Sequence, residues 1–317
     1  MKEKNVFVGI DTSNYTTSIG IVSDGGEVIG NFKLLLPVKS GESGLRQSDA
    51  VFAHIKNIPL LCDKVRELCG SYKIKAVGYS AYPRDAAGSY MPCFLVGEAI
   101  AETLGAFYAS PVYGFSHQSG HIRAALYSSG LCTNENFVSF HISGGTTEIL
   151  YVGQADGKFN IKILGGSKDL HAGQAIDRAG VLMGLNFPCG REMNALANLN
   201  ERKIASPKIC VNGFDCNFSG LENMASKLYC ETNDRSYVSA FVFEFIGKTV
   251  KKLSENVRKK YPDIKIVYAG GVSSNSIIRR RIEDSFNSVF FASAEYSSDN
   301  AAGTALLTRE RYIGQEG

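Results

Sequence analysis

A short pattern, Ser-x-x-Thr-Thr-x-Ile, occurs twice in the chain, as SNYTTSI at residues 13–19 and as SGGTTEI at residues 143–149. Each copy follows an apolar run (VFVGI and FVSFHI) and leads directly into another (SIGIV and EILYV). Short apolar runs that are bounded by polar turns are typical of buried strands. Because the whole strand–turn–strand unit recurs, the sequence predicts two related α/β lobes with a cleft between them.

Helical and strand-like patterns alternate between and after the two copies. Apolar residues recur at helical spacing in five segments, which are 50–69, 94–108, 173–185, 191–199 and 236–260. Strands are expected within 74–81, 108–115 and 265–271. We expect an N-terminal lobe over residues 1–113 and a C-terminal lobe over residues 114–298. A last helix at about 299–317 could pack back on the first lobe.

Composition and charge favour an ordinary enzyme of the cytoplasm. At 317 residues the chain exceeds the usual size of one compact domain, which agrees with two lobes. Its net charge of +3 permits an anionic partner without requiring one. Eight cysteines without a C-x-x-C pair indicate reduced, mostly buried thiols. No apolar run reaches membrane-spanning length, so we expect a soluble, cytoplasmic protein with no membrane partner.

Two of the five histidines, His117 and His121, lie four positions apart in SHQSGHIR. On a helix, this spacing places both imidazoles on one face, where they can bind one first-row metal ion. A third ligand must come from elsewhere, and the best candidate is Asp299 in SSDNAAGTALL. The alternative is two histidines on a helix surface and an aspartate that caps a helix. Spacing alone leaves both interpretations open.

Three glycine-bearing turns could approach a phosphate group. They are Ser143 to Thr147, Gly184 to Gly190, and Gly270 to Asn275. Glycine lets backbone N–H groups come close to an anion, and a following helix start adds a favourable dipole. Each turn by itself is more often a plain connection than a ligand site, but two of them in a protein with repeated lobes favour a bound nucleotide.

Seven collinear segments of the chain together resemble the threonylcarbamoyladenosine synthase family (TsaD-type proteins, formerly described as O-sialoglycoprotein endopeptidases). These segments cover nearly the whole chain and are GIDTS (9–13), His117-x-x-x-His121, Ser143-Gly144-Gly145, GQAIDRAGVLMGLNFPCG (173–190), NFSGLE (217–222), GGVSSN (270–275) and DNAA (299–302). The resemblance implies the two-lobed fold of actin, hexokinase and the heat-shock ATPases, with duplicated βββαβα lobes.

The resemblance also implies roles for matching residues. A divalent metal ion, iron or zinc, would be held by His117, His121 and Asp299. Threonylcarbamoyl-adenylate or another adenine nucleotide would be bound by His141, Ile142, Ser143, Gly144, Gly145, Asp177, Gly190 and Asn275. The family transfers the threonylcarbamoyl group to N6 of the adenosine beside the anticodon of tRNA, and it works with a paralogous subunit and an ATPase partner.

The sequence departs from the family at the expected mouth of the cleft. Tyr15 and Thr16 replace an Asp-Glu pair that could position the attacking amine or take its proton. Asp11 is a weak candidate for a replacement base. The family's Gly-Pro-Gly has become the segment from Tyr82 to Asp85.

These departures keep other hypotheses open beside the transferase. One is a divergent paralogue that binds nucleotide and metal but serves another acceptor, or acts as a scaffold. A metallopeptidase is a weaker hypothesis, because Gln118 follows His117 where H-E-x-x-H would supply a glutamate base.

Overall fold

The computed structural model describes residues 4–13, 15–37, 45–68, 72–155 and 158–316, and it divides into two compact units. The first unit comprises Met1–Ser128, Ala155–Phe159 and Ser298–Gly317, and the second comprises Ser129–Gln154 and Asn160–Ser297. The sequence analysis placed the boundary after residue 113. The first unit extends to Ser128 because the next strand pairs with the first sheet and the helix after it packs within the same unit.

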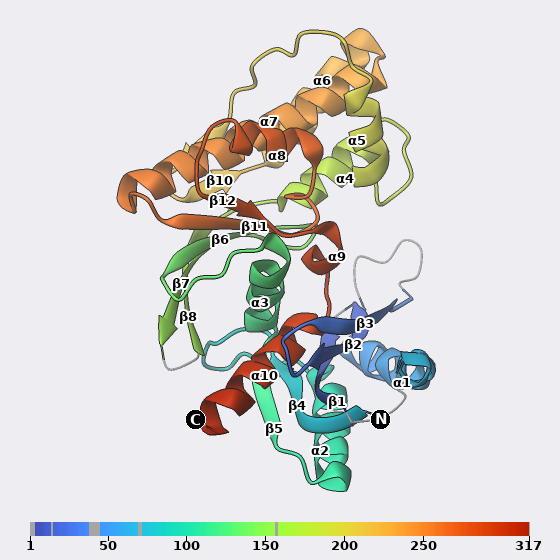
Figure 1. Cartoon of the computed structure of the whole chain (residues 1–317). Helices are drawn as coiled ribbons and strands as arrows, with labels where there is room; N and C mark the ends of the chain where they lie inside the picture. The colour runs from blue at the N-terminus through green and yellow to red at the C-terminus, as the bar shows by residue number, and fades with distance from the viewer. Residues whose placement is uncertain (1–3, 14, 38–44, 69–71, 156–157, 317) are drawn as a thin grey trace. The chain divides into compact units, whose positions relative to one another are not determined.

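The first unit contains a five-stranded sheet in the order β3-β2-β1-β4-β5 (Figure 1). Its strands are β1 (Lys4–Ser13), β2 (Thr16–Ser23), β3 (Val28–Leu35), β4 (Tyr72–Tyr82) and β5 (Val112–Ser116). The first three strands form an antiparallel meander, and β4 and β5 are parallel to β1. This arrangement requires a crossover helix before each parallel strand.

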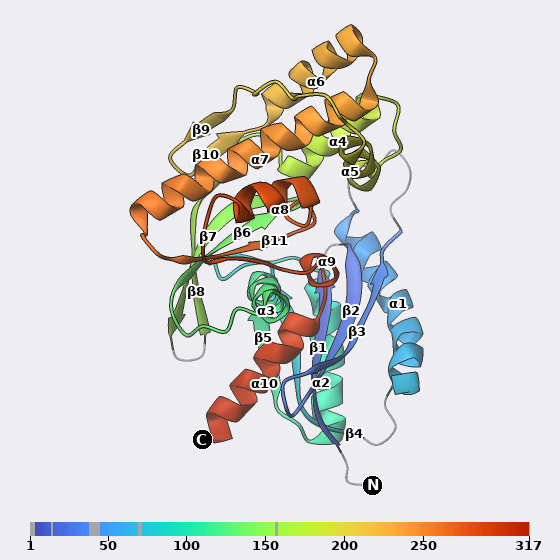
Figure 2. The same cartoon turned by 45° about the horizontal axis from the view of Figure 1, so that its top comes forward.

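Helices cover both faces of this sheet. They are α1 (Gln47–Leu68), α2 (Phe94–Tyr108), α3 (His117–Ser129) and α10 (Ala302–Glu316). Side chains alternate along β1, so Val8 and Ile10 share a core cluster with Leu61 of α1, whereas Phe7 packs with Ala305 of α10 on the other face. Figure 2 shows α10 running along the sheet.

Close backbone contacts hold α10 in place. A Cβ on Gly9 of β1 would overlap the backbone nitrogen of Ala305, and a Cβ on Gly303 would overlap the carbonyl oxygen of Gly120 in α3. Both positions therefore require glycine for a close approach. The start of α10 is consequently fixed against β1 on one side and against α3 on the other.

The second unit repeats this topology. Its sheet has the order β12-β11-β6-β7-β8, with β6 (Phe137–Ile142), β7 (Thr147–Ala155), β8 (Lys158–Gly166), β11 (Lys265–Ala269) and β12 (Val289–Phe291). As in the first unit, the second strand is antiparallel to the first, and the last two strands are parallel to the first. The two Ser-x-x-Thr-Thr-x-Ile copies both join the first and second strands, so the predicted duplication and fold class are confirmed.

The helices of the second unit build its core against this sheet. They are α4 (Ala172–Leu182), α5 (Gly190–Asn198), α6 (Ser219–Thr232), α7 (Arg235–Lys260), α8 (Ser276–Glu283) and α9 (Ala294–Ser297). The expected apolar stripe of α7, from Val238 to Val257, is buried. Helix α6 and the short hairpin of β9 (Cys210–Asn212) and β10 (Asp215–Asn217) were not predicted. Within the described ranges, every helix is too short or too polar to cross a membrane.

Candidate functional site

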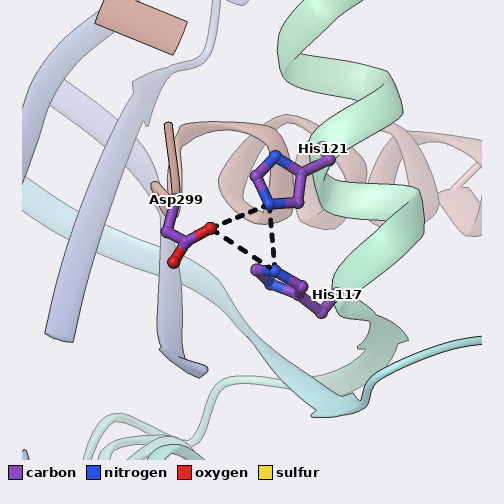
Figure 3. A group of neighbouring side chains, drawn as sticks. All are labelled: His117, His121 and Asp299. Carbon is purple, nitrogen blue, oxygen red and sulfur yellow. Dashed lines mark hydrogen bonds and ion pairs between the residues drawn. The ribbon is translucent and has the colours of Figure 1, made fainter. Parts of the chain in front are cut away.

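The structure brings together the three residues that the sequence analysis selected as metal ligands, all within the first unit. Figure 3 shows both imidazoles projecting from one face of α3 toward the Asp299 carboxylate. Nε2 of His121 lies 2.9 Å from Nε2 of His117 and 3.2 Å from Oδ1 of Asp299. Nε2 of His117 lies 3.8 Å from the same oxygen. The three ligand atoms therefore form a small triangle.

The size of this triangle fits one divalent ion. With metal–ligand bonds of about 2.1 Å, two ligand atoms on one ion lie about 3.0 Å apart at a right angle and about 3.4 Å apart at a tetrahedral angle. The distances of 2.9, 3.2 and 3.8 Å between the three atoms bracket these values. Two imidazoles and one carboxylate also leave coordination positions open for a substrate.

A fourth residue, Asp11 at the end of β1, orients His117. Its carboxylate is fully buried, and Oδ2 lies 2.9 Å from Nδ1 of His117, while Oδ1 accepts the backbone N–H of Ser13 at 3.0 Å. A carboxylate on Nδ1 fixes the tautomer and directs Nε2 to a metal ion. The sequence suggested Asp11 only as a possible base, whereas in the structure its carboxylate contacts the imidazole of His117.

The same carboxylates control the protonation of His117. Burial by itself lowers the pKa of this imidazole, but the adjacent Asp11 and the Asp299 carboxylate outweigh it and raise the pKa to about 9. In the absence of an ion, His117 therefore carries an extra proton at neutral pH. A divalent cation would replace that proton.

Asn300 bonds the start of α10, since its Oδ1 accepts the N–H of Ala302 at 3.2 Å and its Nδ2 donates to the carbonyl of Ser298 at 2.7 Å. Asn300 is only 3% exposed and thereby fixes the short segment that carries Asp299. The Asp299 carboxylate lies beside both imidazoles from this segment.

A separate cavity of about 510 Å³ lies in the second unit, between the first turns of three helices. Gly144, Asp177, Gly190 and Asn275, which are half of the eight predicted nucleotide-binding residues, line it. Among the described residues that line it, Arg191, Asn194 and Phe243 were not predicted.

The other four predicted residues, His141, Ile142, Ser143 and Gly145, lie near this cavity but do not belong to its described lining. Ile142 is buried in the core, and its carbonyl accepts the N–H of Val272 at 3.1 Å. Strand alternation explains this, because the side chain of Ile142 must face the helices that cover the sheet.

Helix starts give the cavity its polar character. Gly173 belongs to α4 and Gly190 to α5, and Asn275 caps α8 by accepting the N–H groups of Ile277 and Ile278 at 3.0 and 3.2 Å. Helix N-termini attract anions through free N–H groups and the helix dipole. A Cβ on Gly144 would meet nothing within 4 Å, so its backbone faces open space.

The carboxyl of Asp177 is held at the cavity wall by the turn before α5. Its Oδ1 accepts the backbone N–H of Cys189 at 2.7 Å. Burial raises the pKa of Asp177, and this hydrogen bond only partly opposes the rise. Asn275 is similarly held, since its Nδ2 donates to Oδ1 of Asn194 at 2.7 Å. Both side chains can therefore offer fixed polar groups to a ligand.

The duplicated lobes define the class of two-lobed proteins to which actin and hexokinase belong, and solved structures agree. Full-length HypF, in its phosphate- and nucleotide-bound form, is 13% identical with a TM-score of 0.61 over 100% of this chain and 47% of that chain. The (R)-2-hydroxyglutaryl-CoA dehydratase component A of Acidaminococcus fermentans is 14% identical, with a TM-score of 0.58 over 98% of this chain and 100% of that chain. These likenesses establish the fold alone.

Sequence comparison identifies the family. A model of the family described as "tRNA N6-adenosine threonylcarbamoyltransferase" matches residues 41–306. Proteins of that name are similar over nearly the whole chain. The one from Endomicrobium trichonymphae is 31% identical over 98% of this chain and 94% of its own length, and the one from Buchnera aphidicola subsp. Schizaphis graminum is 30% identical over 96% and 92%. The chain belongs to the tRNA N6-adenosine threonylcarbamoyltransferase family.

Proposed function

We propose that this protein transfers the threonylcarbamoyl group from threonylcarbamoyl-adenylate to N6 of the adenosine beside the anticodon of tRNA. We further propose that His117, His121 and Asp299 hold one iron or zinc ion for this reaction. Family membership supports the transfer, and the observation that carries the metal role is the triangle of ligand atoms with an imidazole oriented by Asp11. The reaction would take place in the cytoplasm, with a paralogous subunit and an ATPase as partners.

The proposed transfer requires the chain to position the adenylate and to stabilise negative charge. The N6 amine attacks the carbonyl carbon of a mixed anhydride, so a C–N bond forms, the C–O bond to phosphate breaks, AMP leaves and N6 loses a proton. Gly144 and the helix starts in the second unit would hold the adenylate, which makes the transfer effectively intramolecular. A metal ion, when bound, would stabilise negative charge on the reacting oxygens.

The turn between β1 and β2 favours a second candidate function, a divergent paralogue with another acceptor or a scaffold role. Thr16 is only 4% exposed, and the backbone carbonyl of Tyr15 accepts the N–H of Leu36 at 2.8 Å. The turn therefore offers a phenol and a buried hydroxyl where the family has two carboxylates. Without them, the amine would lack a carboxylate base from this turn.

Transfer of the group to tRNA in vitro would test the proposed activity. The protein, supplied with threonylcarbamoyl-adenylate, unmodified tRNA and the partner proteins of a related organism, should convert the target adenosine. If the adenylate binds but no modified tRNA forms, the hypothesis of a divergent paralogue would replace that of a transferase.

Metal content gives an independent test of the metal role. Purified wild-type protein should contain close to one iron or zinc ion per chain, and His117→Ala/His121→Ala should contain little. His171→Ala, which changes a histidine of the second unit, is the matched control and should keep the ion. Equal metal content in all three proteins would refute the metal role.

Nucleotide binding tests the cavity of the second unit. Gly144→Val adds a side chain where a Cβ meets nothing within 4 Å, so it should leave the fold intact and block the cavity. Asn275→Ala should also weaken binding of the adenylate, measured by calorimetry, and should cost about 1 kcal/mol of stability because α8 loses its cap. Asn160→Ala, at an exposed position of β8, is the control. If Gly144→Val bound as tightly as wild type, the cavity would not be the nucleotide site.

A further inference from the structure

We propose that Asp85 is a positioning residue for the metal centre, which it serves by anchoring the first turn of α3. It lies in the segment from Tyr82 to Asp85 that replaces the family's Gly-Pro-Gly. This inference rests on the metal role proposed above, and it gives that segment a function.

Three hydroxyl groups converge on the Asp85 carboxylate. Ser116 Oγ donates to Oδ2 at 2.6 Å, Ser119 Oγ donates to the same oxygen at 3.1 Å, and the Tyr82 hydroxyl donates to Oδ1 at 3.2 Å. Ser116 is fully buried and Ser119 is 7% exposed, so two of the three donors lie inside the unit. Hydrogen bonds to a carboxylate are about twice as strong as those between neutral groups.

Pro83 of this segment and Ser116 of β5 accept hydrogen bonds from the first backbone N–H groups of α3. Ser116 Oγ accepts the N–H of Ser119 at 3.0 Å, and the carbonyl of Pro83 accepts the N–H of Gln118 at 3.1 Å. A helix leaves its first N–H groups without partners, so these bonds fix where α3 begins. The negative charge of Asp85 at this end is favourable to the helix dipole.

Ser119, which donates to Asp85, and the metal ligand His117 lie on different faces of α3. His117 stands between Ser116 and Gln118, and Ser119 is about 200° around the helix from His117. The hydrogen bond from Ser119 to Asp85 therefore lies on the side of α3 away from His117. On the opposite side, Asp11 holds the His117 ring at Nδ1. Metal sites require ligand positions within about 0.5 Å, so a loosened first turn should weaken ion binding.

Cobalt(II) titration of the full-length, metal-free protein tests this inference, because its visible absorption reports both affinity and coordination geometry. Asp85→Ala should bind Co²⁺ about tenfold more weakly and with an altered spectrum, in line with the effect of outer residues at other metal sites. Asp85→Glu should restore part of the affinity. Asp24→Ala, an exposed aspartate of the β2–β3 turn in the same unit, is the control and should bind like wild type.

Two further measurements separate positioning from general loss of structure. Ser119→Ala should also weaken binding, and its effect should not add to that of Asp85→Ala, because both remove one network. Leu61→Ala lowers the melting temperature through the core, yet it should keep the wild-type spectrum.

Specific outcomes would overturn the inference. Wild-type affinity and spectrum in Asp85→Ala would refute it and leave the metal role intact, as would an equal loss of affinity in Leu61→Ala. If wild-type protein binds no Co²⁺, the metal role falls as well.

Discussion

Binding of a divalent ion at His117 should release one proton near neutral pH. With its pKa raised to about 9 by Asp11 and Asp299 against the effect of burial, the metal-free imidazole is protonated at pH 7.5. A metal ion binds only the neutral imidazole, so the ion must displace this proton. Apparent affinity should therefore depend on pH in a range where an ordinary histidine is already neutral.

The magnitude follows from the distance between the pH and the pKa. At pH 7.5, competition from the proton lowers the apparent affinity about 30-fold, which corresponds to about 2 kcal/mol. Between pH 7 and 8.5, the affinity should rise about tenfold per pH unit, and the rise should level off above pH 9. In Asp11→Asn the attraction that holds the proton is lost, so this slope should nearly vanish. The plateau affinity should also fall about 10- to 100-fold, because the ring is no longer oriented.

Calorimetric titration with Zn²⁺ in two buffers of different protonation enthalpy measures the released proton directly. The wild type should release about one proton at pH 7.5, and Asp11→Asn clearly less. Asp263→Asn, an exposed residue of the second unit, serves as control. Thermal melting of the metal-free protein provides a second check. Stability due to the raised pKa is fully present below pH 6.5 and is lost as the pH rises through about 9. A wild-type affinity that does not change between pH 7 and 8.5 would refute this reasoning.

Two other predictions concern the first unit. Gly303→Ala should destabilise the protein by about 1–3 kcal/mol in urea unfolding and weaken metal binding, because its Cβ would overlap the carbonyl of Gly120. In Gly314→Ala, the new Cβ would meet nothing within 4 Å, so neither stability nor metal binding should fall. Equal stability of the two variants would contradict the packing argument. His54 is fully buried, and burial lowers its pKa, so stability should fall as the pH drops below about 6.5. His54→Gln should flatten this decline in urea unfolding between pH 7.5 and 5.5, and an unchanged decline would exclude His54 as its cause.

Local patterns predicted the parts of the fold that depend on neighbouring residues. The repeated Ser-x-x-Thr-Thr-x-Ile unit identified both hairpins, and the apolar stripe of α7 identified the longest helix of the second unit. The spacing of His117 and His121 placed both on one helical face because i and i+4 residues are neighbours there. Asp299 was selected because it begins a segment of small residues, and the match of DNAA (299–302) to a family motif gave it the same role.

Contacts between residues that are distant in the sequence could not be predicted from local patterns. Asp11 and His117 are 106 positions apart, and no local pattern connects an aspartate at a strand end with a particular imidazole. The role of Asp85 depends likewise on where β4, β5 and α3 meet. The family resemblance assigned both Ile142 and Gly144 to the nucleotide site, whereas Ile142 is buried in the core and Gly144 lines the cavity.

Because Asp299 lies just before α10, assembly of the metal centre depends on the packing of α10 against β1. The two imidazoles come from the middle of the sequence, but their carboxylate partner arrives only with the segment that docks on β1 through Gly9 and Ala305. A chain that stops before residue 299 would expose Phe7 and the apolar face around it, and its histidine pair would hold an ion by two bonds. An intact centre would thus report that the segment carrying Asp299 had docked on β1.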